Sequence, residues 1–588
     1  MTDSASKRDQ TCLSATIVNI NHLFNYSEEI LHEHHLSDPD FYRIVEEQKK
    51  IAAAIAAADI KEDHQPVRSP VQNNTCTQPA LIESIYFKEF RQTELKEKIA
   101  KNQEIIHEAL AETQSMIAPR TEAHNRKQSY TSIEEETSDR SEKLSVQIQA
   151  WRSLLPVLIR RFASIPDPRR AKSIKHKMAV VMLYGLFAFI FQLQSRRAIN
   201  RELSGPTLFE HLKRVFPELE SIPHADTVAR LLARINPEEI EKTHLALINQ
   251  LIRNKKFSKL LIAGCLPVAI DGTQKLYRDG ELQDLRWLSR NVGRIGDQSS
   301  QQYIYVLEAN IVFANGLTIP LLTEYLKTDS NVLTNPEGKQ ECELVAFERI
   351  TAKLKKYFPR LKIIMFADAL FAMQPVLEIL QGYQWEYMIH FSGKKLTDLA
   401  KILNTARETQ QSLPDNPYYR GRAQTFHWYN DVKWGYNGQL TIHLVCCQEN
   451  WQEVDKKTGE IITKYSQKQW ISSIKINLDN IHELCNLGAR KIWLMEDSIN
   501  TEKHRGYHYE HAFSYDWYAM QGFHLLMRLA HAVNAISEFS KKLKKWIKEQ
   551  GCSAILKLIR ETLFNPWLPN GWYGAQNKKP VRLELQLE

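Results

Sequence analysis

Two short apolar runs, each ending at an aspartate, constrain the fold of this 588-residue chain more than any other feature. The first reads PVAID and ends at Asp271, and the second reads LKIIMFAD and ends at Asp368. Short runs rich in Ile and Val are typical of strands buried on both faces of a sheet. If these two strands are neighbours, their terminal carboxylates lie side by side.

The segments around these runs predict an α/β fold. Tyr303–Phe313 and Leu317–Tyr325 are apolar runs joined by Ala314-Asn-Gly316, which is a hairpin signal. Glu341–Tyr357 has the pattern of an amphipathic helix, and a helix at Met373–Leu380 precedes a strand at Trp385–His390. This order predicts three antiparallel strands followed by a parallel extension with helices. The core therefore begins near residue 259 and its first part ends near 395.

Residues 396–476 interrupt that alternation. Thr425–Tyr429, Gln439–Cys447 and Gln469–Ile476 have strand patterns, and Asn437-Gly438 is a turn signal between two of them. We expect a β-rich insertion whose last strand rejoins the main sheet. Its many Trp and Tyr residues fit β-sheet packing, with stacking on unpaired bases as the alternative.

The part of the chain before the core consists of two segments that differ in composition. Residues 1–145 are polar and are expected to form a partly helical or disordered extension. Residues 146–258 are expected to form an all-helical domain that binds DNA, with helices such as Gln147–Phe162 joined by basic connections. Arg169 and Arg170 follow two prolines that end this helix, so they are either DNA contacts or solvated loop charges.

A polar helix is predicted at Ile492–Tyr509, after the insertion. Glu496, Asn500, Lys503 and Tyr507 recur at spacings of four, three and four, which places them on one helical face. A core-facing stripe would carry Leu or Ile at these positions. We expect this helix and the helical region up to residue 588 to close the core.

Three carboxylates, Asp271, Asp368 and Glu496, can therefore meet at one edge of the sheet. Clustered carboxylates repel one another unless a cation is present, and their hard oxygens suit Mg²⁺ or Mn²⁺. Two such ions can activate a nucleophile and stabilise the leaving oxygen in phosphodiester chemistry. Each acid has a plainer alternative, because Asp271 can cap a turn and Asp368 can cap the next helix. Glu510 is a rival to Glu496 as the third acid.

Net charge, cysteine spacing and the apolar segments indicate the kind of partner and the cellular compartment. The net charge of +8 fits a polyanionic partner without establishing one. The eight cysteines are scattered and lack zinc-finger spacing, which predicts reduced thiols and a cytoplasmic protein. The N-terminus has no signal-peptide pattern, and the apolar run Met178–Phe191 is too short to span a membrane, so we expect a buried helix there.

The chain resembles the DDE transposases of bacterial insertion sequences over about residues 150–545. The stretches that carry the resemblance are FASIPDPRRAKSIKHK, IPHADTVARLLARI, VAIDGTQ, YIYVLEANIVFANGLTIPLLTEYL, KQECELVAFERI, MFADALFA and WLMEDSINTEKHRGYHYEH. It implies an RNase H-like catalytic core in which Asp271, Asp368 and Glu496 bind two Mg²⁺ or Mn²⁺ ions. It also implies that Lys503 contacts DNA phosphate, with Asn500 and Arg505 beside it.

The resemblance further implies the partners. One partner is double-stranded DNA, both as the element's terminal inverted repeats and as target DNA. The other is a second copy of the chain, and no membrane partner is expected. The family signature often has a tyrosine and an arginine at the positions of Ala489 and Ile492, and Arg490 or Lys491 can substitute for the missing cation. Two other functions stay open: a nuclease without strand transfer, and a DNA-binding protein with a decayed site.

Overall fold

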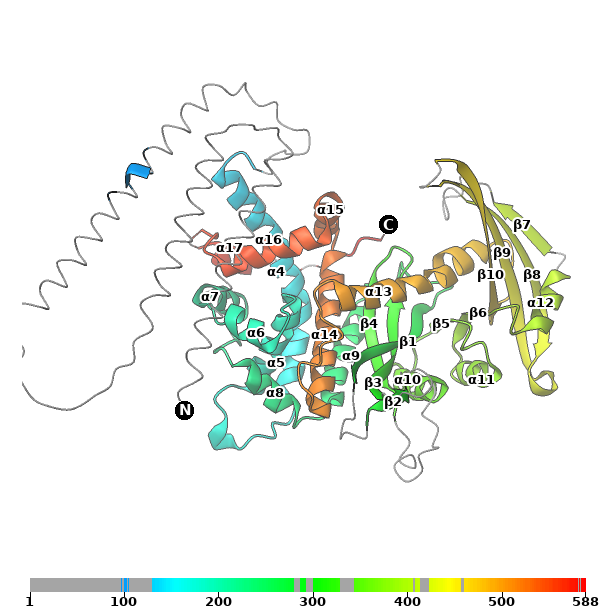
Figure 1. Ribbon diagram of the computed structural model, residues 1–588, viewed down its shortest axis with the longest axis horizontal. Helices are drawn as coiled ribbons and strands as arrows, with labels where there is room; N and C mark the ends of the chain where they lie inside the picture. The colour runs from blue at the N-terminus through cyan, green and yellow to red at the C-terminus, as the bar shows by residue number, and fades with distance from the viewer. Residues whose placement is uncertain are drawn as a thin grey trace, which may run out of the picture. The chain divides into compact units, whose positions relative to one another are not determined.

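The computed structural model divides the chain into two compact units, Met1–Arg126 and Lys127–Glu588. Almost all of the residues it describes belong to the second unit (Figure 1). The described residues are a few between 97 and 104, then 130–279, 286–291, 300–327, 343–405, 408–412, 422–455, 459–569, 571–579, 581 and 583–587. Most of the predicted polar extension lies outside them.

One mixed sheet organises the second unit. Among the described residues, ten strands form this sheet in the order β2-β3-β1-β5-β6-β10-β9-β8-β7, and β4 also pairs with β3. The strands are β1 (Leu266–Asp279), β2 (Leu288–Asn291), β3 (Ser300–Val312), β4 (Thr318–Tyr325), β5 (Ile363–Ala367), β6 (Glu386–His390), β7 (Glu408–Ser412), β8 (Ala423–Trp434), β9 (Leu440–Val454) and β10 (Ile461–Ser472).

The predicted core strands are confirmed. β1, β3 and β4 are antiparallel, while β5 pairs in parallel with β1 on one side and with β6 on the other. β1 is longer than expected, because it continues past Asp271 to Asp279. Asp271 therefore lies inside a strand and does not terminate it. The strand can continue because β3 pairs with it along this extra length.

The β-rich insertion continues the core sheet. β10 pairs with β9 along its length and then pairs antiparallel with β6 through Trp470–Ser472, so the prediction that the last strand rejoins the sheet is confirmed. α12 (Thr397–Asn404) precedes these strands, and Figure 1 shows β7–β10 at the end of the sheet away from the helical segment.

The predicted helical segment is present. Its helices are α4 (Ile133–Ala163), α5 (Met178–Ile190), α6 (Arg196–Leu203), α7 (Pro206–Val215), α8 (Ala225–Leu232) and α9 (Glu238–Arg253). α4 begins well before the expected boundary at residue 145, because Ser132 caps it by accepting a hydrogen bond from the Glu135 N–H. α6 was not predicted as a helix, and Ser195 caps it in the same way.

α5 has 13 residues, nearly all buried, as expected for a core helix. In the part of the chain that the structure describes, no helix combines the length and apolarity that crossing a bilayer requires.

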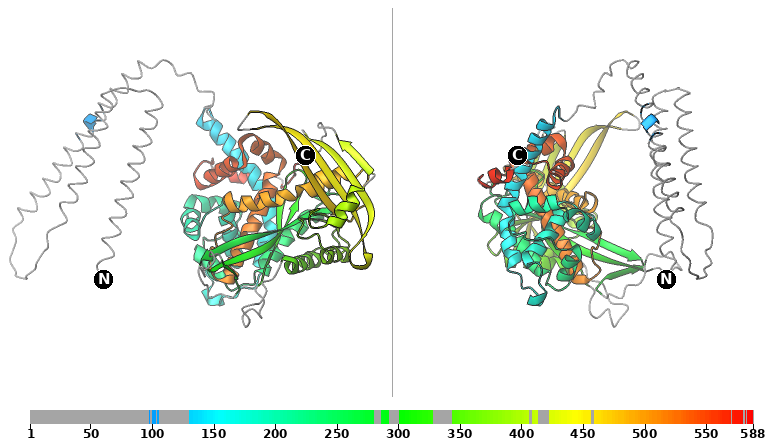
Figure 2. Two further views of the ribbon diagram at one scale, coloured as in Figure 1. Left: turned by 45° about the vertical axis from the view of Figure 1, so that its right-hand side comes forward. Right: turned by 90° about the vertical axis from the view of Figure 1, so that its left-hand side faces the viewer.

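The C-terminal helices complete the core. α14 (Trp517–Glu538) packs against α5, α8 and β4, and Figure 1 shows it between the helical segment and the sheet, with two further views of the chain in Figure 2. α15 (Lys541–Gln550), α16 (Cys552–Phe564) and α17 (Trp572–Asn577) follow. α17 packs Tyr573 and Gln576 into the core.

Candidate catalytic site

Pairing of β1 with β5 brings Asp271 and Asp368 together. The parallel register pairs Leu266 with Ile363 and Ala269 with Phe366. Continued by two residues, the same register places Asp271 opposite Asp368, which follows the last residue of β5. The expectation that the two apolar strands are neighbours is therefore confirmed. Asp368 also accepts a hydrogen bond from the Leu370 N–H at 3.0 Å, as expected for an aspartate that caps a turn.

The electrostatics of Asp271 show which acids surround it. Burial is the main cause that raises its pKa, to about 7, although a hydrogen bond from the Gly272 N–H opposes the shift. The charges of Asp368, Glu496 and Glu343 raise it further. Asp368 and Glu496 thus both lie within electrostatic reach of Asp271, and so does a fourth acid, Glu343.

Glu343 is the acid that sequence reasoning missed. It is the first residue of α10 (Glu343–Tyr357), and its carboxylate accepts a hydrogen bond from the Tyr305 hydroxyl. A Cβ added at Gly272 would lie 2.7 Å from Glu343 Cδ, Glu343 Oε1 and Tyr305 Oη. Glycine is therefore needed there so that a carboxylate and a phenol can cover the strand beside Asp271. In the sequence, Glu343 resembles any acid in a first helical turn, so it gave no signal.

The polar helix is α13 (Trp493–His504), and it is shorter than predicted. Glu496 and Asn500 are exposed and Lys503 is half-buried on its predicted outer face. Tyr507 was wrongly placed on that face, because the helix ends at His504 and the Tyr507 ring is buried and accepts a hydrogen bond from Asn534. The segment before α13 is not α-helical: η4 (Glu483–Gly488) is a π-helix and η5 (Ala489–Ile492) is a 3₁₀-helix.

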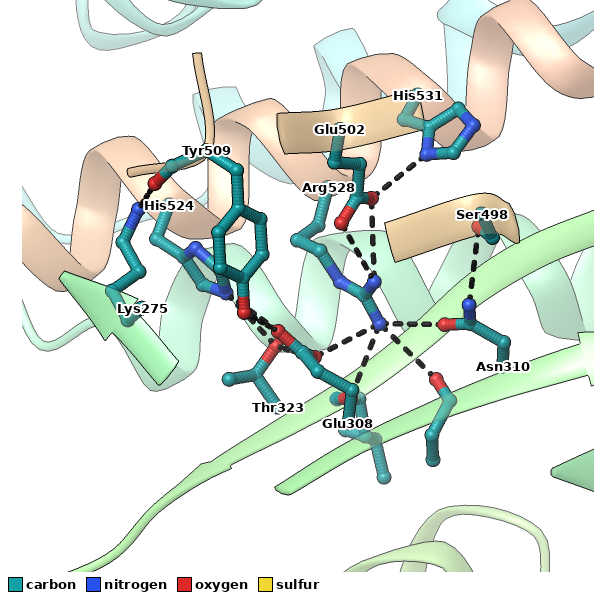
Figure 3. Close-up of polar contacts among 12 residues, drawn as sticks. Lys275, Glu308, Asn310, Thr323, Ser498, Glu502, Tyr509, His524, Arg528 and His531 are labelled. Carbon is teal, nitrogen blue, oxygen red and sulfur yellow. Dashed lines mark hydrogen bonds and ion pairs between the residues drawn. The ribbon is translucent and has the colours of Figure 1, made fainter. Parts of the chain in front are cut away.

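A buried polar network ties α13 to the sheet (Figure 3). The Arg528 guanidinium of α14 lies 3.2 Å from both carboxylate oxygens of Glu502 on α13 and 3.0 Å from a Glu308 oxygen on β3. It also donates to Asn310 Oδ1 at 2.7 Å, and Asn310 in turn donates to Ser498 on α13 at 3.2 Å. One guanidinium thus binds an acid from the helix and an acid from the strand.

Glu308 is held ionised inside this network. Its burial would raise the pKa, but Arg528 and the hydrogen bonds from His524 and Thr323 outweigh burial and hold the pKa at about 2. The Tyr509 hydroxyl donates a further hydrogen bond of 2.8 Å to Glu308.

The network fixes the orientation of the site. β3 pairs Glu308 directly opposite Asp271, so both side chains point to the same face of the sheet. Glu502 lies about 120° around the α13 axis from Glu496. By binding both Glu308 and Glu502, Arg528 therefore sets the rotation of α13, which carries Glu496. This rotation is set relative to β1, which carries Asp271.

The expected DNA-contact residues differ in accessibility. Arg505 and Arg170 are exposed and Lys491 is half-buried, while Lys503 forms an ion pair of 3.4 Å with Glu510. The rival acid Glu510 is thus the partner of the predicted phosphate-binding lysine.

Two arginines are bound to the protein itself. Arg490 is 3% exposed and pairs with Glu449 at 2.7 Å, so its burial contradicts the expected contact with DNA phosphate. It joins η5 to the β-rich insertion. Arg169 pairs with Asp167 at 2.6 Å and donates to the His176 carbonyl, so it stabilises the turn after α4.

The donor chemistry suits a hard cation. Asp271, Asp368 and Glu496 offer carboxylate oxygens, although within the described ranges no three acidic, histidine or cysteine side chains already converge on one point that a metal ion could occupy. Mg²⁺ is commonly held by one or two carboxylates together with waters and substrate phosphate. The Asp271–Asp368 pair meets that requirement, with Glu496 nearby on the exposed face of α13.

A comparison with protein families matched part of the chain. The family described as DDE_Tnp_1-associated matches residues 159–248. The match points to a transposase family. It covers the helical segment from the end of α4 to α9 and includes none of the predicted catalytic acids. A comparison with curated proteins found no match.

Proposed function

We propose that the chain is a DNA transposase with an RNase H-like core and an Asp271–Asp368–Glu496 catalytic triad. The observation that carries the proposal is the parallel register of β1 and β5, which sets two aspartates side by side within reach of Glu496. The strand order β4-β3-β1-β5-β6 and the family match over residues 159–248 support it.

In this proposal the carboxylates hold two Mg²⁺ or Mn²⁺ ions. Bound there, the ions would activate the attacking oxygen and stabilise the leaving oxygen of a phosphodiester. Asp271 and Asp368 hold the metal from the sheet, and Glu496 completes the site from α13. Lys503, with Asn500 and Arg505 beside it, contacts the phosphates of DNA, and Lys491 and Arg170 extend this contact.

The substrate is double-stranded DNA. The enzyme hydrolyses a phosphodiester at the end of a mobile element, within a terminal inverted repeat, and joins the freed 3′-hydroxyl to target DNA. The helical segment 146–258 binds the element end, and two copies of the chain hold the two ends together. The reaction takes place on chromosomal DNA in the cytoplasm.

The test uses purified full-length protein, Mg²⁺ and DNA that carries the ends flanking the gene. We expect nicked and joined products, and we expect Asp271→Asn, Asp368→Asn and Glu496→Gln each to abolish both. Asp497→Asn is the matched control, because Asp497 is an equally exposed acid on α13 that points about 100° away from Glu496. Nicked DNA without joined product would indicate a nuclease. Cleavage that survives all three substitutions would refute the triad.

A further inference from the structure

A groove of about 720 Å³ lies outside the acid cluster. It is bounded by the start of α6, the end of β1 and the segment that follows α13. Its lining residues are Ser195, Arg196, Arg197, Leu276, Tyr277, Arg278 and the run from Glu510 to Tyr515. The polar side chains of this lining make it unlike a packing defect in the core.

The groove carries an excess of positive charge. Arg197 and Arg278 are exposed, and neither forms an ion pair with any residue in the described part of the chain. Arg196 pairs with Asp226 at 3.0 Å but keeps 41% of its side chain exposed. Glu510 is the acid in this lining, and it is already paired with Lys503. Two exposed guanidinium groups without an ion-pair partner among the described residues favour an anionic ligand.

Two exposed tyrosines belong to the lining of the groove. Tyr277 is 56% exposed and Tyr515 is 64% exposed. The Arg278 guanidinium lies 5.3 Å from the centre of the Tyr515 ring, which steadies both side chains. Arginines beside exposed aromatic rings are the combination that binds single-stranded nucleic acid, because phosphates meet the cations and bases stack on the rings. In a duplex the base faces are already stacked on one another.

The groove is connected to the acids through β1. Arg278 lies seven residues after Asp271, so the two are ~20 Å apart along the strand. A bulge between Gln274 and Leu276 shifts the register, and the β3 partners of Asp271 and Arg278 are Glu308 and Gln302. Since these partners are an even number of residues apart, Asp271 and Arg278 point to the same face of the sheet. The Lys503–Glu510 pair adds a second link, from α13 to the groove.

We propose that this groove binds an unpaired stretch of the DNA strand adjacent to the phosphate that is cleaved. Arg197 and Arg278 bind its phosphates, and Tyr515 stacks on a base. The inference rests on the proposed function, since it assigns the path of the strand that leaves the same site. The acids and the groove then act on one strand, which must be unpaired where it enters the groove.

The test measures binding of full-length Asp271→Asn protein, without Mg²⁺, to a labelled oligothymidylate and to a blunt duplex of equal length. Tyr515→Ala should weaken oligothymidylate binding by about 5- to 150-fold, the range for loss of one stacked base. Tyr515→Phe should bind like the parent. Tyr277→Ala should also bind like the parent, because Tyr277 precedes Arg278 on β1 and its side chain points to the opposite face of the sheet. Arg197→Ala and Arg278→Ala should each lower the slope of log affinity against log salt by about 0.7.

Tyr465→Ala is the matched control, because this tyrosine of β10 is 77% exposed outside the groove, and it should bind like the parent. Unchanged oligothymidylate affinity in Tyr515→Ala would overturn the proposal. An equal loss of affinity for duplex and single-stranded DNA would also overturn the proposal, because it would mean that the groove binds the backbone of a duplex. The binding assay needs no catalysis. A protein that binds as expected but neither cleaves nor joins DNA would therefore refute the proposed function and leave the inference about the groove standing.

Discussion

Replacing Arg528 with methionine should strongly destabilise the protein. The substitution keeps the aliphatic stem of the side chain but removes the guanidinium that binds Glu308 and Glu502, whose side chains are both fully buried. Breaking a buried ion pair from one side costs about 3–5 kcal/mol, because the remaining charge is left without a partner. Here one substitution leaves two such carboxylates, so we expect the upper part of that range.

The loss should depend on pH. In the parent protein the pKa of Glu308 is lowered from 4.5 to about 2, so its stabilising contribution is present above about pH 4.5 and fades as the pH falls towards 2. In Arg528→Met, burial without the guanidinium raises the pKa of both carboxyl groups above the ordinary value. The folded variant then binds more protons than the unfolded chain, so its deficit grows as the pH rises from about 5 to about 8.

Urea unfolding followed by tryptophan fluorescence measures this loss. The control is Lys557→Met, which removes an exposed pair of 3.8 Å with Glu561 and should cost no more than about 0.5 kcal/mol. Adding Glu308→Gln and Glu502→Gln to Arg528→Met should recover part of the loss. A deficit below about 1 kcal/mol that stays constant across this pH range would refute the reasoning.

Two further predictions concern the neighbourhood of Asp271. Asp271→Asn should abolish cleavage and yet raise the stability of the protein in EDTA. The pKa of the Asp271 carboxyl is raised from 3.8 to about 7, so its ionised form destabilises the fold as the pH rises through that range. The gain in stability should therefore grow with pH in thermal melts. A melting temperature equal to or below that of the parent would contradict this. Gly272→Ala should cost about 1–3 kcal/mol, because its Cβ would collide with Glu343 and Tyr305. Gly272→Ala/Glu343→Ala should recover part of that loss in urea unfolding, and the absence of any recovery would mean that the collision is elsewhere.

The sheet could be predicted because its signals are local. Apolar runs bounded by turns identified the strands, and an acid next to each of two runs located the edge where Asp271 and Asp368 meet. The end of β1 was missed because the first residues of β3 extend its pairing, and pairing with a distant segment is not encoded in the strand itself. The helix before α13 changes type at Gly488, where a Cβ would lie 3.0 Å from the Phe366 ring, and this contact is made only in the folded chain.

The polar network left a signal that sequence reasoning did not use. Glu308 lies inside the apolar run YIYVLEANIVF, and Arg528 lies inside the apolar helix HLLMRLAHAV. A single charge in a segment that must be buried requires a counter-charge, so each of the two predicts a partner of the opposite sign. The groove lined by Arg197, Tyr277 and Tyr515 left no comparable signal, since its residues come from three segments that meet only on folding.

Because β10 continues the hydrogen bonding of β6, the insertion protects an edge that the core would otherwise expose. β6 has a buried middle, Tyr387–Ile389, and its backbone groups are paired with β10 through Trp470–Ser472. A shortened chain without residues 396–476 would present a bare apolar strand to solvent, and such edges recruit strands from other molecules. The insertion therefore cannot be trimmed as a separate module, and attempts to isolate a minimal core should yield aggregates until the edge of β6 is capped.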